Sequence, residues 1–151
     1  MRVDVRYFTK NGATRKLAEA IAAAVGAEAL TVDTPLEKRA DVVFLGASIY
    51  GGKPDPAVLR FIRQNARNIG KIVVFGSACT SRSAVPAIKA AAAVEAVKTA
   101  EMYFQCKGAF WFLNKGRPNE QDCADAAEFA KKQIKLYNGK KEKLCKTIIQ
   151  K

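Results

Sequence analysis

The sequence contains no histidine, one tryptophan and four cysteines among its 151 residues. The cysteines lie far apart, with spacings of 27, 17 and 22 positions from Cys79 through Cys106 and Cys123 to Cys145. Zinc sites and dithiol redox motifs require closely spaced cysteines or histidines, so neither class of site is well supported. We therefore expect four reduced thiols and no metal centre.

The sequence also lacks a long hydrophobic run. No apolar stretch approaches the ~20 residues that a membrane-spanning helix needs, and the first residues alternate like a β-strand rather than forming a signal peptide. Apolar residues nevertheless make up 49% of the chain, which is enough to build the core of one folded domain. These features predict a soluble, cytoplasmic protein.

Acidic residues are scarce relative to basic ones. The chain has 26 Lys and Arg but 14 Asp and Glu, which gives a formal net charge of +12. The basic residues are spread along the chain instead of forming one block, so we expect a solvated basic surface rather than a nucleic-acid-binding face. Such a surface attracts acidic partners and favours peripheral contact with anionic surfaces.

Five apolar segments with strand character alternate with four helical patterns. The strands are expected at Arg2–Phe8, Ala27–Val32, Asp41–Gly46, Lys71–Gly76 and Ala100–Cys106. The helices are expected at Ala13–Gly26, Pro56–Asn68, Ala84–Val97 and Asn119–Tyr137. This alternation predicts an α/β fold, a parallel sheet with helices on both faces and the ligand-binding loops on one rim. The basic tail after residue 137 is expected to be either a short helix or a frayed end.

The loop from Thr9 to Thr14 joins the first strand to the first helix. Such a loop presents unpaired backbone N–H groups at the positive end of a helix, which is how proteins hold phosphate groups. Thr9 and Thr14 supply hydroxyl groups, Asn11 an amide, and Gly12 allows a close backbone approach. An ordinary helix start, capped by Thr or Asn, is the alternative that this loop alone leaves open.

Three motifs resemble those of the flavodoxin family. Val5–Thr14 resembles the family's phosphate loop, usually T/S-x-T-G-x-T, while Val43–Gly52 resembles its second loop and Val74–Ser77 the entry to its third. The resemblance covers residues 1–137 in order, which it identifies as a flavodoxin-like FMN-binding domain followed by a basic tail at 138–151. It implies a three-layer sandwich of the short-chain type, with a five-stranded parallel sheet in the order 2-1-3-4-5, one FMN and electron transfer.

The resemblance also assigns residues to the cofactor. It assigns the FMN phosphate to Thr9, Lys10, Asn11, Gly12, Ala13 and Thr14. It assigns one face and the N5 edge of the flavin ring to Ser48, Ile49, Tyr50, Gly51 and Gly52. It assigns the other face to Ser77, Ala78, Cys79 and Thr80. Tyr50 is able to stack on a flat ring, although a surface aromatic and an ordinary Gly-Gly turn are the alternatives.

Two departures from the family pattern predict weakened FMN binding. Asn11 and Ala13 stand where the family usually has other polar residues, and no aromatic residue occupies the third loop at Ala78–Thr80. A cofactor-free flavodoxin fold, using its basic rim to bind a protein or polyanion, is therefore the alternative function.

The rim loops offer little for acid–base catalysis. Asp55 is their one carboxylate and the chain has no histidine, so any redox chemistry would belong to the flavin. This favours an electron carrier with redox partner proteins over a flavin-dependent reductase or oxidase. The aromatic loop from Lys107 to Pro118 has two interpretations: either Lys115 and Arg117 grip an anion, or the loop packs on the sheet edge and Asn119 caps the last helix.

Overall fold

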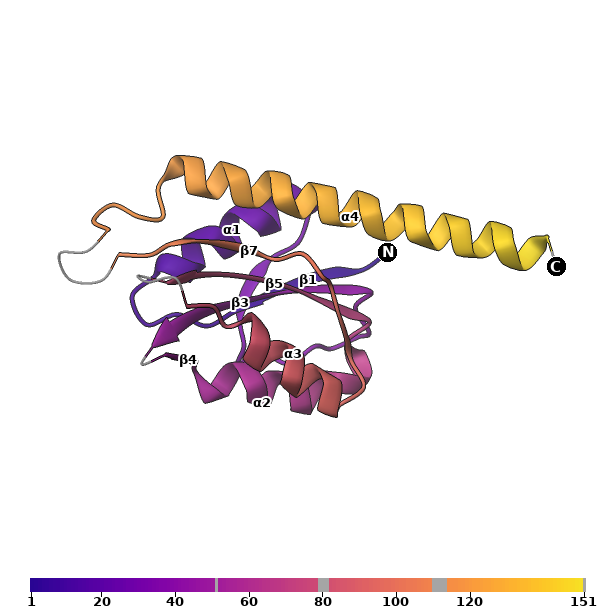
Figure 1. Cartoon of the computed structure of the whole chain (residues 1–151), viewed down its shortest axis with the longest axis horizontal. Helices are drawn as coiled ribbons and strands as arrows, with labels where there is room; N and C mark the ends of the chain where they lie inside the picture. The colour runs from indigo at the N-terminus through magenta and orange to yellow at the C-terminus, as the bar shows by residue number, and fades with distance from the viewer. Residues whose placement is uncertain (51, 79–81, 110–113, 151) are drawn as a thin grey trace.

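The computed structural model describes residues 1–50, 52–78, 82–109 and 114–150, and the backbone alone for Tyr50. A central sheet is sandwiched between two pairs of helices (Figure 1). Helices α1 (Ala13–Val25) and α4 (Glu120–Ile149) pack together over one face, and α2 (Pro56–Asn65) and α3 (Val85–Val94) over the other. The predicted three-layer α/β sandwich is confirmed.

In the described part of the chain the sheet contains seven strands in the order β2-β1-β3-β5-β6, with β4 beside β3 and β7 beside β5. Their bounds are β1 Val3–Tyr7, β2 Ala29–Thr31, β3 Val42–Tyr50, β4 Lys53–Pro54, β5 Lys71–Ala78, β6 Lys98–Thr99 and β7 Phe104–Lys107. All pairs are parallel except β3 with β4. The predicted order holds for the five positions across the sheet, but the number of strands differs because β4 is added and the fifth position is divided.

The division of the fifth strand follows from the register of the sheet. Ile72 pairs with Thr99 and Phe75 pairs with Phe104, so five steps along the outer strand match three steps along β5. The two surplus residues cannot stay in the ladder, and the chain bulges outward between β6 and β7. The strand expected over Ala100–Cys106 is therefore wrong for its first four residues.

The two central strands are buried on both faces. Val43 and Leu45 of β3 point into the core beneath α2 and α3, whereas Phe44 and, on β5, Phe75 point into the core beneath α1 and α4. Successive side chains of a strand point to opposite faces, so a strand covered on both sides is apolar throughout. The unbroken apolar runs of the sequence thus become the centre of the sandwich.

Strands β3 and β5 run further toward the rim than their apolar runs indicated. Ser48 pairs with Ser77, and the chain then turns back so that Ile49 pairs with Pro54. Residues 47–50 and 77–78, expected in loops, therefore belong to strands. Continued pairing with a neighbouring strand satisfies their backbone groups, which outweighs the local preference for a loop.

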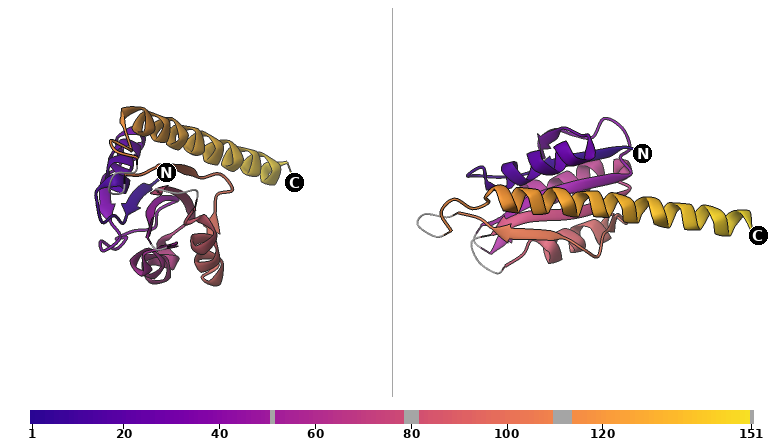
Figure 2. Two further views of the ribbon diagram at one scale, coloured as in Figure 1. Left: turned by 60° about the vertical axis from the view of Figure 1, so that its left-hand side comes forward. Right: turned by 90° about the horizontal axis from the view of Figure 1, so that it is seen from above.

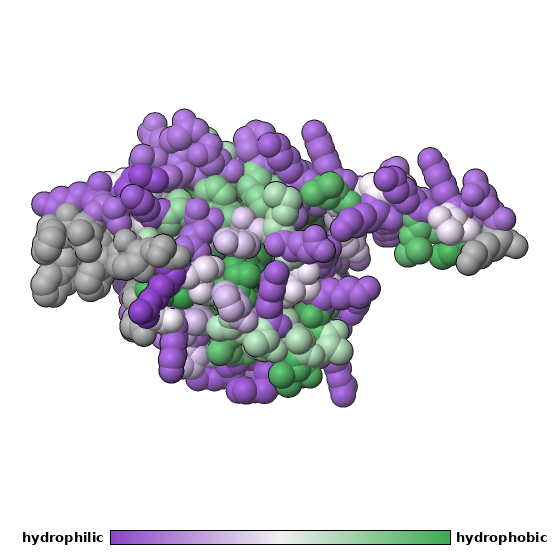
Figure 3. Space-filling model, in the orientation of Figure 1, coloured by the Kyte–Doolittle hydropathy of each residue, from purple (hydrophilic) through white to green (hydrophobic). Residues whose placement is uncertain are grey.

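Helix α4 runs to Ile149, well past the end expected at Tyr137. Its last part projects beyond the body of the protein (Figures 1 and 2), and every residue from 141 to 150 is exposed. The space-filling view shows hydrophilic side chains over much of this projection (Figure 3). Of the two states that the sequence left open for the tail, the helix is the one observed. No helix in the described ranges is long and apolar enough to cross a bilayer.

Candidate functional site

The loop between β1 and α1 folds back onto the start of its own helix. Thr9 Oγ1 accepts a hydrogen bond from the Gly12 N–H at 3.0 Å, and Asn11 Oδ1 accepts one from the Ala13 N–H at 3.1 Å. Gly12 has a φ of 87°, a left-handed conformation that residues with a side chain rarely adopt. Two amides of the loop are thus bonded by the loop's own side chains.

The next amides of α1 remain available for a ligand. Gly12, the N-cap residue, has no side chain to cap the helix, Asn11 bonds the N–H of Ala13 alone, and the first turn contains no acid. Thr14 and Arg15 occupy its second and third positions, where N–H groups have no partner within the helix. A methyl group built on Gly12 would meet no atom within 4 Å, so the space beside the loop is open. This positive helix end suits an anion.

Three hydroxyl groups from different elements meet beneath the start of α1. Thr14 Oγ1 is hydrogen-bonded to Ser48 Oγ and lies 3.3 Å from Ser77 Oγ, and the two serine oxygens are 3.4 Å apart. The three residues are 0%, 5% and 3% exposed, respectively. This hydroxyl cluster fixes α1 to β3 and β5. The three hydroxyl groups are buried and are bonded to one another.

A glycine makes this close packing possible. A Cβ on Gly46 would overlap the ring of Phe75 and lie 2.9 Å from Thr14 Cγ2. Without a side chain at Gly46, the first turn of α1 lies directly on the centre of the sheet. Nothing near Gly46 in the sequence indicates which helix covers it.

The second and third loops also approach each other on the rim. The Arg82 guanidinium lies against the Cα of Gly52, so these two loops are in contact. Ile49 is half-buried and Ala78, at the end of β5, is buried. The remaining predicted ring contacts, Gly51, Cys79, Thr80 and the side chain of Tyr50, lie outside what the structure describes.

The aromatic loop is joined to the first loop at its base. Asn11 Nδ2 donates a hydrogen bond to the Ala109 carbonyl at 3.0 Å, and the Ala109 N–H donates to the Arg117 carbonyl at 2.9 Å. The two ends of the aromatic loop are therefore held together, and Asn11 connects them to the predicted phosphate loop. Nothing in the spacing of Asn11 and Ala109, 98 positions apart, indicated this contact.

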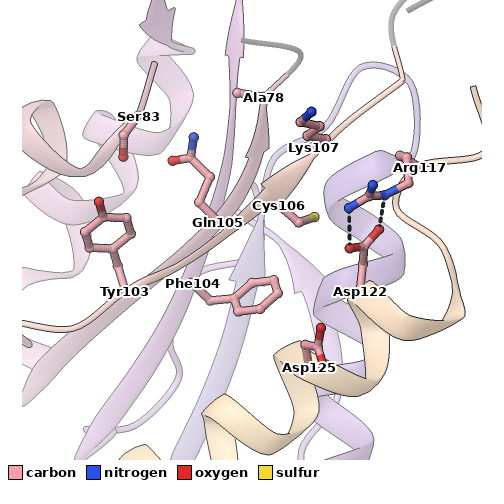
Figure 4. A pocket seen from close by; sticks show the side chains of 10 residues that line it. All are labelled: Ala78, Ser83, Tyr103, Phe104, Gln105, Cys106, Lys107, Arg117, Asp122 and Asp125. Carbon is pink, nitrogen blue, oxygen red and sulfur yellow. Dashed lines mark hydrogen bonds and ion pairs between the residues drawn. The ribbon is translucent and has the colours of Figure 1, made fainter. Parts of the chain in front are cut away.

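Arg117 is already paired with an acid of α4 (Figure 4). Its Nε and Nη2 atoms donate to Asp122 Oδ2 and Oδ1 at 2.5 and 2.7 Å, and this pairing holds the pKa of the carboxyl below its usual value. Asn119 and Asp122 form a reciprocal capping box at the helix start. The expected cap at Asn119 is confirmed, and Arg117 uses two of its donors on Asp122 of the protein itself.

A cavity of about 940 Å³ opens beside this pair, along the outer edge of β7 (Figure 4). Cys106 lines it, and burial raises the pKa of this thiol to about 12. The thiol is therefore neutral at physiological pH and is not a nucleophile. Within the described ranges, no group of three or more Cys, Asp or Glu residues is placed to hold a metal ion.

Comparison with known proteins identifies the family. The model of the family described as "Flavodoxin domain" matches residues 5–111. The chain belongs to this family. The match includes the first, second and third loops of the flavodoxin rim and ends within the aromatic loop. No curated protein matches the sequence.

Solved structures support the same fold at low sequence identity. A flavodoxin from the domain Archaea superimposes with a TM-score of 0.75 at 16% identity, covering 91% of this chain and 99% of that one. Oxidised flavodoxin 1 from Bacillus cereus gives 0.68 at 19% identity, covering 89% and 98%. A mutant flavodoxin from Fusobacterium nucleatum, bound to flavin mononucleotide, gives 0.59 at 12% identity, covering 87% and 96%.

Proposed function

We propose that this flavodoxin-family protein binds FMN on the rim of its sheet and transfers electrons between redox partners. The observation that carries the proposal is the start of α1. Its free amides, its left-handed Gly12 and the absence of acid in its first turn suit a phosphate group, and the ends of β3 and β5 lie beside it.

The predicted loop residues fit the FMN phosphate, but with a different set of contacts from the one that the family resemblance implies. Asn11, Gly12 and Ala13 would hold the phosphate together with the backbone N–H of Thr14, because the Thr14 hydroxyl belongs to the hydroxyl cluster. Gly12 and Ala13 would exchange their present bonds to Thr9 and Asn11 for bonds to phosphate oxygens. The flavin ring would lie between the second and third loops. FMN supplies the redox chemistry when bound, and the chain binds and orients it.

The described residues favour an electron carrier over an enzyme with its own acid or base. Asp55 caps α2 by accepting a hydrogen bond from the Ala57 N–H at 2.9 Å, and Asp122 is paired with Arg117. Both carboxylates thus have structural partners within the protein. The rim instead exposes Lys53, Lys107 and Lys115, which suit an acidic partner protein.

Comparing FMN with riboflavin tests the phosphate site. We expect FMN to bind with sub-micromolar affinity and riboflavin at least tenfold more weakly, because riboflavin has the same ring without the phosphate. Asn11→Asp should weaken FMN binding about tenfold or more by repelling the phosphate, with little effect on riboflavin. Asn11→Ala is the control without an added charge: like Asn11→Asp it removes the bond to the Ala109 carbonyl, and it also removes the bond from the Ala13 N–H. Flavin fluorescence quenching measures all of these affinities.

Two results would contradict the proposal. Absence of FMN binding at tens of micromolar would favour the cofactor-free binding module. Equal binding of FMN and riboflavin would mean that the start of α1 does not hold the phosphate.

The reduction potential tests the role of the basic rim. A nearby positive charge stabilises the anionic reduced flavin, so Lys53→Gln should lower the potential by on the order of 20 mV for an exposed charge. Potentiometric titration measures this shift, and Lys89→Gln, on α3 away from the rim loops, is the control. An unchanged reduction potential in Lys53→Gln would mean that the charge of Lys53 does not stabilise the reduced flavin.

A further inference from the structure

A second cavity lies at the opposite end of the sheet from the rim. It has a volume of about 220 Å³ and includes Val42 and Lys71, the first residues of β3 and β5. Helix α4 covers it with Gln133, Leu136 and Lys140, shortly before the helix leaves the body of the protein (Figures 1 and 2). Because the FMN loops follow the carboxyl ends of the same strands, this cavity is separate from the proposed cofactor site.

The floor of the cavity is apolar. Val42 and Val73 are 1% and 2% exposed and belong to the core beneath α1 and α4. Leu136 of α4 lines the cavity as well, yet it is 51% exposed. A ligand with an aliphatic chain would cover these groups and remove apolar surface from water.

Two lysines and one acid, Glu101, line the same cavity, and neither lysine forms an ion pair with a described residue. Neither Lys71 nor Lys140 has an acid oxygen within 4.0 Å in the part of the chain that the structure describes. Burial lowers the pKa of Lys71, and the positive charges of Lys140 and Lys98 lower it further against the opposing effect of Glu101. Two cations that repel each other beside an apolar floor would both be stabilised by one anion.

The amide of one largely buried residue completes the polar side of the cavity. Gln133 of α4 is 9% exposed and lines the cavity, and its side chain makes no hydrogen bond to any described residue. No buried side-chain nitrogen or oxygen atom of the described residues lacks a partner, so the amide atoms of Gln133 are accessible to solvent. Its NH₂ group is therefore a third donor beside the two ammonium groups.

We propose that this cavity binds a small amphipathic carboxylate, with its oxygens on Lys71, Lys140 and Gln133 and its short aliphatic chain on the apolar floor. Carboxylate oxygens accept strong, charge-assisted hydrogen bonds from ammonium groups. The volume is below the roughly 300–1,000 Å³ of sites for drug-sized ligands, so the chain must be short. This ligand site is independent of the proposed electron transfer.

Titration with octanoate, followed by NMR of the ¹⁵N-labelled full chain, tests the proposal. We expect saturable one-to-one binding, with the largest shifts around the cavity. Lys71→Gln and Lys140→Gln should each weaken binding about tenfold, the effect of losing one charge-assisted hydrogen bond. Lys132→Gln is the matched control, because Lys132 is an exposed lysine of the same helix that does not line the cavity.

Two further measurements separate the anion site from a hydrophobic groove and from the flavin. Octanol, with the same chain and no charge, should bind at least tenfold more weakly, and octanoate should raise the pKa of Lys71 followed by its side-chain NMR signals. Octanoate should bind equally with and without FMN, so failure of the flavin proposal leaves this test intact. No saturable binding, equal affinity for octanol, or equal weakening by Lys132→Gln would overturn the proposal.

Discussion

Helices α1 and α4 lie side by side and both begin at the rim, but their starts are built in opposite ways (Figure 1). The start of α4 is closed: Asn119 and Asp122 cap its backbone, Glu120 and Asp122 supply negative charge, and Arg117 neutralises Asp122. The start of α1 has no such cap among the described residues and no acid in its first turn.

The two helices are also anchored differently. In α4, Asp122 is part of the cap on the first amides and also joins the helix to Arg117. Helix α1 is fixed from below, where Thr14 contributes its hydroxyl to the cluster with Ser48 and Ser77 while the upper side of the turn stays open. A helix start that is held by buried side chains keeps its amides and its positive end available to an anion. This difference explains why we assign the phosphate to α1 and not to α4.

Removing the cap of α4 should have the largest effect on stability. Asp122→Ala removes half of the capping box, so we expect the free energy of unfolding to fall by about 1–2 kcal/mol. Chemical denaturation measures the change. Asp125→Ala, one turn further along, is the control and should change stability by less than about 0.5 kcal/mol. Equal losses in the two variants would show that the closed start of α4 does not contribute specifically.

Removing the hydroxyl of Thr14 should have a smaller effect and should separate the two functions of the α1 start. Thr14→Val keeps the shape of the side chain but breaks its hydrogen bond to Ser48, which should cost about 1 kcal/mol of unfolding free energy. FMN affinity should remain within about threefold of that of the original protein, because the backbone N–H of residue 14 is retained. A tenfold loss of FMN affinity in a folded variant would instead mean that the hydroxyl binds the phosphate.

The contribution of the Asp122 charge to the free energy of unfolding should depend on pH. The pKa of Asp122 is lowered in the folded protein by its hydrogen bond from Arg117, so its charge stabilises the fold above the unfolded pKa of about 3.9. This contribution is lost as the pH falls through the folded pKa. The difference in unfolding free energy between the protein and Asp122→Asn should thus be constant from pH 7 to 5 and should decrease below pH 4. Denaturation at several pH values measures it, and a constant difference down to pH 2 would contradict this account.

Local sequence patterns correctly predicted the positions of the four helices, though not the end of α4, as well as the two buried central strands and the cap at Asn119. These features depend on residues within a few positions of each other, such as alternating apolar residues or a capping residue followed by its partner. Errors occurred where pairing with another element decides the outcome. The extension of β3 to Tyr50 depends on pairing with β5 and β4. The outer strand divides into β6 and β7 because it has two residues more than the stretch of β5 that it pairs with.

The sequence by itself determined that this protein is a three-layer α/β sandwich with an anion-compatible loop at Thr9–Thr14. Only the tertiary structure decided which polar groups of that loop are bonded within the protein. Ser48 and Ser77 lie 34 and 63 positions from Thr14, and their contact exists because two strands and a helix pack at one point. Likewise, the cavity beneath α4 exists because a helix and the ends of two strands meet there. Local propensity carries no information on such distances, which are set by packing and register.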